Sequence, residues 1–137
     1  MTPEQLRVAQ KGGLTIGSHT VKHPRLDRLP PEQAGCEMSV SKCELEKILE
    51  EPVDLLSFPH GAYTSDVLEQ ARKIGYRRVF GIKPKWIQGE MSGFFLDRVA
   101  VNPSDWDIEF RLKIKGAYRW EPAAAELKSK LFRREHK

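Results

Sequence analysis

The stretch GGLTIGSHTVKHP, residues 12–24, decides both the fold and the chemistry expected of this chain. Its first half, LTIG, is a short apolar run next to glycines, which predicts a short buried strand. His19 and His23 follow four residues apart, a spacing that would place both rings on one face of a helix. Pro24 disfavours helical geometry at His23, so we expect the strand to run into a tight loop that carries both histidines.

This placement predicts a metal site. In parallel α/β barrels the active site lies at the carboxyl ends of the strands, where this loop is expected. Imidazole is the commonest metal ligand, and zinc binds it readily. His19 and His23 are therefore candidate ligands. On the spacing alone, two exposed or hydrogen-bonded loop histidines are the more frequent case, and this interpretation stays open beside the metal site.

Three further segments follow in order: SFPHGAY at residues 57–63, GY at 75–76 and LDRV at 96–99. Together with residues 12–26 they resemble the polysaccharide deacetylases, the carbohydrate esterase family that includes chitin and peptidoglycan deacetylases. The histidine stretch is similar to the family's second motif, His-Ser/Thr-x-x-His followed by Pro-x-Leu, and residues 57–63 are similar to its third. The agreement in order and spacing runs from about residue 12 to residue 118.

The resemblance implies an α/β fold, an incomplete (β/α) barrel of the polysaccharide deacetylase type with mainly parallel strands and outer helices. We expect residues 1–120 to form the C-terminal part of such a domain, without its N-terminal strands, and residues 121–137 to form a basic helical tail. The alternation of strand and helix patterns agrees with a mainly parallel sheet.

Apolar periodicity and helix-breaking residues place the individual elements. Helices are expected at about residues 2–11, 31–50, 65–74 and 102–116, the third capped by Thr64 or Ser65 and the fourth by Ser104 or Asp105. Strands are expected at 53–58, 77–82 and 93–101, with a loop at 83–92.

The resemblance also implies a divalent metal cofactor, zinc in the first place, held by His19 and His23. The third-motif residues implied to bind substrate are Pro59, His60, Gly61 and Tyr63. Two alternatives stay open here: His60 is either a third metal ligand or a simple loop histidine, and Tyr63 serves either packing or substrate contact.

The sequence departs from the family pattern at several points. The chain contains no Asp-Asp pair, although the family's first motif supplies one aspartate as metal ligand and a second as base. The Leu-x-His motif that supplies the acid is also absent, and Ser57 stands where many members have arginine. We therefore assign no catalytic residue and expect weak or no activity from the isolated chain.

Composition limits the classes of protein to which the chain can belong. With 137 residues, 39% hydrophobic and 31% charged, the chain suits one ordinary domain. No apolar run is long enough to span a membrane and no signal peptide follows Met1, so the sequence as it stands predicts a cytoplasmic protein, although family members often work outside the membrane. Cys36 and Cys43 lie two turns apart on an expected helix, too far for a disulfide.

Three functional hypotheses follow. The first is a metal-dependent polysaccharide deacetylase that hydrolyses N- or O-acetyl groups on a polysaccharide or oligosaccharide, with a second copy of the chain as a candidate for completing the barrel. The second is a non-catalytic glycan- or metal-binding fragment. The third, nucleic-acid binding by the basic tail, is disfavoured because acidic residues interrupt the tail and no aromatic stacking platform accompanies it.

Overall fold

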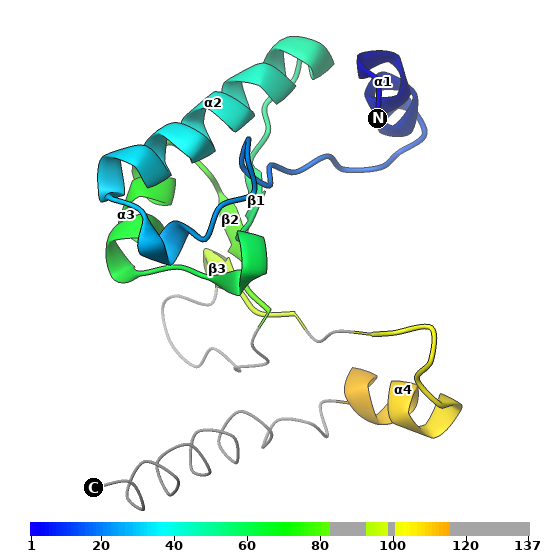
Figure 1. Ribbon diagram of the computed structural model, residues 1–137. Coiled ribbons are helices and arrows are strands. Elements are labelled where there is room, and N and C mark those ends of the chain that lie inside the picture. Colours follow the sequence, from blue (N-terminus) through cyan, green and yellow to red (C-terminus); the bar gives the residue numbers. More distant parts are fainter. Residues whose placement is uncertain (83–92, 99–100, 116–137) are drawn as a thin grey trace, which may run out of the picture.

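The computed structural model describes residues 1–82, 93–98 and 101–115. Its elements are, in order, α1 (Pro3–Lys11), a 3-10 turn (Leu26–Arg28), α2 (Pro31–Leu49), β1 (Leu55–Ser57), a second turn (Pro59–Gly61), α3 (Ser65–Lys73), β2 (Arg78–Phe80), β3 (Phe95–Leu96) and α4 (Asp107–Ile114) (Figure 1). The expected loop at 83–92 and the expected basic tail at 121–137 lie outside the described residues.

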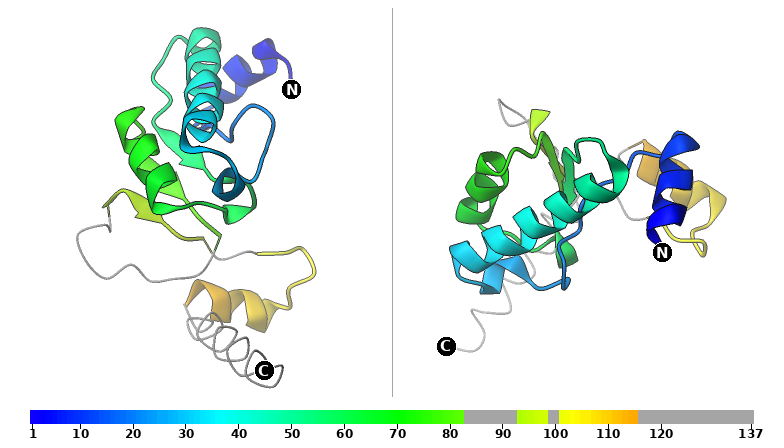
Figure 2. Two further views of the ribbon diagram at one scale, coloured as in Figure 1. Left: turned by 60° about the vertical axis from the view of Figure 1, so that its left-hand side comes forward. Right: turned by 90° about the horizontal axis from the view of Figure 1, so that it is seen from above.

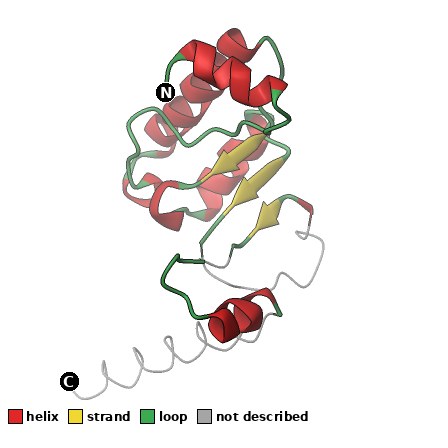
Figure 3. Cartoon of the chain, turned by 90° about the vertical axis from the view of Figure 1, so that its right-hand side faces the viewer, coloured by secondary structure: helices red, strands yellow, loops and turns green. Residues whose placement is uncertain are grey.

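The three strands form one parallel sheet in the order β1-β2-β3 (Figure 3). Leu56 pairs with Val79, and Val79 pairs with Phe95 on the other side. On the outer side of β1, Ser18 makes a single parallel bridge to Leu56. Because all these segments run the same way, the residues that follow them meet at one edge of the sheet.

Helices α2 and α3 lie side by side and cover one face of the sheet (Figure 2). Side chains alternate along a strand, so the buried residues Leu56 and Val79 point toward these helices. The core between the layers also contains Leu26, Ala34, Met38, Phe58, Val67 and Ala71. The alternate strand residues Leu55, Ser57 and Phe80 are half-buried and line a hollow of about 500 Å³.

Local sequence explains the helix boundaries. Thr2 caps α1 in a reciprocal pair of hydrogen bonds with Gln5, and the hydroxyl of Thr64 accepts from the Val67 amide at the start of α3. Helix α2 begins at Pro31 and ends before Glu50, which adopts a left-handed conformation. The expected helices at 31–50 and 65–74 are thus present, within one residue at each end.

Two expectations about packing were wrong. Residues 14–17 form no strand and Leu14 is 64% exposed, because only the Ser18 bridge ties this segment to β1 and no further layer of the described chain covers it. The apolar pattern of residues 102–116 also predicts Ile108 on the buried side of its helix, but in α4 this side chain is 65% exposed. Asp105 does not cap α4 but bonds to the Asn102 amide and to Lys113.

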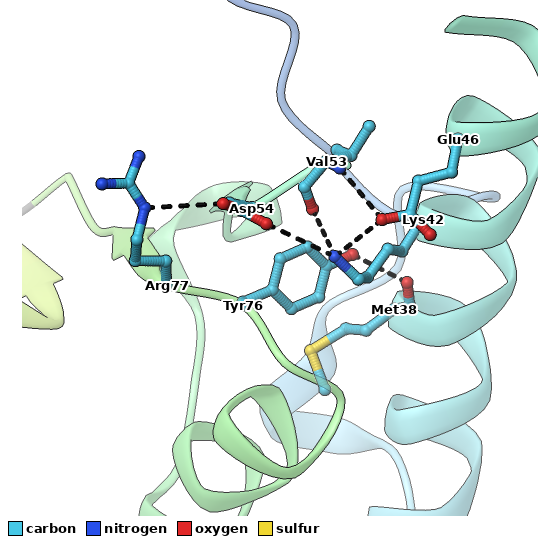
Figure 4. A network of polar contacts seen from close by, with 7 residues as sticks. All are labelled: Met38, Lys42, Glu46, Val53, Asp54, Tyr76 and Arg77. Carbon is cyan, nitrogen blue, oxygen red and sulfur yellow. Dashed lines mark hydrogen bonds and ion pairs between the residues drawn. The ribbon is translucent and has the colours of Figure 1, made fainter. Parts of the chain in front are cut away.

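A polar network ties the amino-terminal ends of β1 and β2 to α2 (Figure 4). Lys42 donates to the Val53 carbonyl at 2.7 Å and pairs with Glu46 at 2.9 Å, and Glu46 in turn accepts from the Val53 amide. The Tyr76 hydroxyl donates to the Met38 carbonyl at 2.8 Å. These contacts stabilise the end of the sheet opposite to the histidine loops.

Candidate functional site

The two histidine-bearing loops meet at the carboxyl end of the sheet. His19 follows directly after the Ser18 bridge, and His60 lies in the turn after β1. The ring centroids are 4.8 Å apart for His19 and His23, and 4.6 Å apart for His23 and His60. Three imidazoles from two separate segments therefore gather at the edge where a barrel places its active site.

A hydrogen bond fixes the orientation of His19. Its Nδ1 lies 2.7 Å from the carbonyl oxygen of Ser57, and a carbonyl can only accept. Nδ1 must therefore carry the proton, so the neutral ring keeps its lone pair on Nε2. This is how a metal-binding histidine is normally held, with the far nitrogen anchored to a carbonyl or a carboxylate.

Glu37 anchors the loop that carries His23. One carboxylate oxygen accepts from the backbone amides of Val21 and Lys22, at 3.0 and 2.9 Å. No local sequence signal reports this role of Glu37, because the two amides that it binds are fifteen and sixteen residues away.

The same loops hold non-glycine residues in the left-handed region. Thr20, His23 and His60 have φ values of 67°, 56° and 56°. Such conformations cost free energy and persist where the surrounding structure enforces them, commonly at functional sites. The tight turn expected before Pro24 is thus present at His23, and the turn at His60 shares its geometry.

The third-motif residues occupy different environments. Pro59 and Gly61 are buried, and a Cβ at Gly61 would collide with Ile82. Tyr63 packs against the rings of Phe58 and Phe95, and burial, together with the Asp97 carboxylate, raises its pKa. His60 is exposed and is the one of the four predicted residues that lines the hollow. Substrate binding by these four residues stays a prediction.

Arg98 belongs to the LDRV segment at residues 96–99, to which sequence reasoning assigned no role in the site. It lines the hollow together with His19 and His60. Its Nη2 donates to the Ser57 hydroxyl at 2.7 Å and its Nε to the Gly81 carbonyl at 3.2 Å. No local sequence signal reports this contact, because Ser57 and Arg98 are 41 residues apart.

The donor set fits part of a metal site. Two imidazoles, of which His19 has a fixed tautomer, are good zinc ligands, but a catalytic zinc needs three protein ligands and a water. Across residues 1–82, 93–98 and 101–115, no group of three or more His, Cys, Asp or Glu side chains is arranged to hold a metal ion. The residues therefore fit a histidine pair that needs at least one further ligand.

The fold and this histidine pair define an incomplete α/β barrel with a candidate metal site, and comparison with known proteins identifies the family. The profile described as polysaccharide deacetylase matches residues 1–79. YxkH of Bacillus subtilis (strain 168), which carries the family's name, is 31% identical over 103 residues, 75% of this chain and 37% of its own. The chain belongs to the polysaccharide deacetylase family.

Solved structures confirm the fold. The deacetylase PplD of Streptococcus pyogenes superposes with a TM-score of 0.74 at 23% identity, over 82% of this chain and 50% of its own. BC0361, a polysaccharide deacetylase from Bacillus cereus, gives 0.73 at 22% identity, over 83% and 36%. The expected incomplete (β/α) barrel is confirmed, and this chain spans half or less of each of these relatives.

Within the described ranges, no helix combines the length and the apolar character needed to cross a bilayer.

Proposed function

We propose that this chain supplies the histidine half of a metal-dependent polysaccharide deacetylase, with His19 and His23 as ligands of a divalent ion, zinc in the first place. The observation that carries the proposal is the His19 Nδ1 contact with the Ser57 carbonyl, which leaves Nε2 available as a donor. The substrate class is an acetylated polysaccharide or oligosaccharide, from which an N- or O-acetyl group is hydrolysed.

When bound, the metal ion polarises the acetyl carbonyl and lowers the pKa of a water molecule. The chain's own contribution is positional. The Ser57 carbonyl holds His19, the Glu37 carboxylate holds the loop of His23, and His60 and Arg98 line the hollow beside them. The described residues that line this hollow include no carboxylate, and none is assigned the role of base.

The third ligand and the base come, on this proposal, from outside the described residues. A second copy of the chain, or an upstream segment of a longer protein, would bring them beside Ser18, where β1 has only the single bridge on its outer side. Sedimentation equilibrium with and without zinc tests the second copy: zinc-dependent dimers indicate it, and a zinc-bound monomer excludes it.

Zinc titration calorimetry on the purified chain tests the site. We expect one site per chain, lost in His19→Ala and in His23→Ala. Glu44→Gln is the matched control, because it changes an exposed side chain of α2 and leaves the expected ligands in place. Unchanged binding in both ligand variants would refute the metal site, and no binding in the wild type would refute a site completed by this chain or by its second copy.

The alternative is a non-catalytic glycan- or metal-binding protein of the same family. The absence of an Asp-Asp pair from this sequence favours it, because the family's base is among those residues. Acetate release from acetylated chitooligosaccharides by the zinc-loaded chain decides between the two. Release that requires His19 supports the enzyme, and tight zinc binding without release supports the binding protein.

A further inference from the structure

Arg98 lies across the carboxyl ends of the sheet. From its place two residues after β3, its Nε reaches the Gly81 carbonyl just after β2, and its Nη2 reaches the Ser57 hydroxyl at the end of β1. Its guanidinium carbon stands 5.7 Å from the centre of the Phe80 ring. One side chain therefore joins all three strands at the edge that carries the histidines.

Ser57 links Arg98 to His19. Its hydroxyl accepts from Arg98 at 2.7 Å, while its carbonyl accepts from His19 Nδ1 at 2.7 Å. Its amide donates to the Ser18 carbonyl at 2.9 Å, so the same residue also holds the backbone next to His19. A shift of Ser57 would thus move both the anchor of the imidazole and the chain that carries it.

The donor on Arg98 is charged, which makes the contact with Ser57 stronger than a neutral hydrogen bond. The planar guanidinium also presents its N–H groups in a rigid fork, so one orientation satisfies Gly81 and Ser57 together. A lysine would keep the charge but would lose the fork. The geometry is that of a support for Ser57, whose carbonyl in turn holds His19.

We propose that Arg98 is a positioning residue for His19, which holds Ser57 so that its carbonyl keeps the imidazole in the Nδ1–H form. The inference deepens the proposed metal site and rests on it for its consequence, zinc affinity. Outer-shell partners of metal-binding histidines typically change metal affinity by about 10- to 100-fold when they are removed.

If only the charge of Arg98 mattered, its removal would change zinc affinity in the opposite direction. A guanidinium near a divalent cation repels it, so if Arg98 acted only through its charge, its removal would tighten zinc binding. If Arg98 acts by positioning, removal weakens binding. The direction of the change therefore separates the two roles.

The first test is zinc titration of the full chain with Arg98→Met, Arg98→Lys, Ser57→Ala and the double variant Arg98→Met/Ser57→Ala. We expect about a 10-fold loss in zinc affinity for Arg98→Met and for Ser57→Ala, and a smaller loss for Arg98→Lys. The double variant should bind zinc no more weakly than the weaker-binding of its two single variants, because both changes act along one path. Tighter binding in Arg98→Met, or losses that multiply in the double variant, would overturn the proposal.

The second test needs no metal. Long-range ¹H–¹⁵N correlation spectra of the apo chain at a pH of about 8.5, where free imidazole is neutral, report which nitrogen of His19 carries the proton. We expect Nδ1–H in the wild type and a shift toward Nε2–H in Arg98→Met and in Ser57→Ala, with far-ultraviolet circular dichroism confirming that each variant is folded. The same tautomer in all folded variants overturns the positioning role, whereas a shift in a chain that binds no zinc upholds it and refutes only the proposed metal site.

Discussion

Raising the pH from about 8 to 11 is expected to destabilise this chain through one buried phenol, Tyr76. Its ring is 3% exposed, and its hydroxyl donates to the Met38 carbonyl at 2.8 Å. Burial raises the pKa of Tyr76 from 10.0 to about 12, and the nearby Glu46 carboxylate adds to this. Ionisation would remove the donor and leave a phenolate facing a carbonyl oxygen.

The magnitude follows from the two pKa values. A folded-state pKa above the unfolded one means that the folded chain holds the proton more tightly, so the stabilisation is complete below pH 10 and is lost as the pH rises toward 12. For a shift from 10 to 12, the loss is about 1.4 kcal/mol at pH 11 and about 2.3 kcal/mol at pH 12.

Urea unfolding of the wild type and of Tyr76→Phe, followed by circular dichroism at both pH values, isolates this contribution, because all other titrating groups are common to both proteins. At pH 8 the variant should be less stable by about 1 kcal/mol, the typical worth of its lost hydrogen bond. At pH 11 the wild type should have lost that advantage. A stability difference that is the same at both pH values would refute the reasoning.

Three further predictions concern the loop anchor, a helix cap and an acidic group. Glu37→Gln should speed hydrogen exchange of the Val21 and Lys22 amides by about 10-fold, since a neutral acceptor is weaker than a carboxylate. Thr64→Val should lower the free energy of unfolding by about 1 kcal/mol in urea melts by removing the cap of α3. The Val53 amide and Lys42 lower the pKa of Glu46, so this carboxylate should stabilise the fold above pH 4.5 and should cease to do so as the pH falls through its folded-state pKa. Glu46→Gln should therefore flatten the dependence of the free energy of unfolding on pH in this acid range.

Each of these has a matched control. Glu44→Gln changes an exposed carboxylate on the same helix as Glu37 and should leave the loop amides unaffected. Thr64→Ser keeps the capping hydroxyl and should remain near wild-type stability. Glu32→Gln, exposed at the start of α2, should leave the acid limb of the stability curve in place. A control that matches its variant would contradict the corresponding assignment.

Sequence reasoning located what depends on local patterns. The apolar periodicity of residues 31–49 and the threonine before residue 65 placed α2 and α3, because helix faces and caps depend on near neighbours. The short strands were found with overlong boundaries, since their limits are set by pairing with distant segments. The strand expected at 14–17 failed for the same reason: an apolar run becomes a buried strand only where another layer covers it.

The same distinction between local patterns and distant contacts applies to the candidate site. His19 and His23 were identified from one continuous stretch, and the structure brings His60 beside them. The roles of Glu37 and of Arg98, which was noted only as part of the LDRV segment, were not predicted, because they lie in contacts to residues at least fifteen positions away.

The left-handed backbone at His23 and His60 costs stability, so selection for stability alone would disfavour histidine at both positions. Glycine adopts such angles without the steric penalty that a Cβ incurs, so His23→Gly and His60→Gly should be tolerated well or should even raise the melting temperature. A directed-evolution campaign scored on heat resistance alone would therefore drift toward glycine at both positions. The selected protein would be more heat-resistant but would have lost two of the three clustered imidazoles.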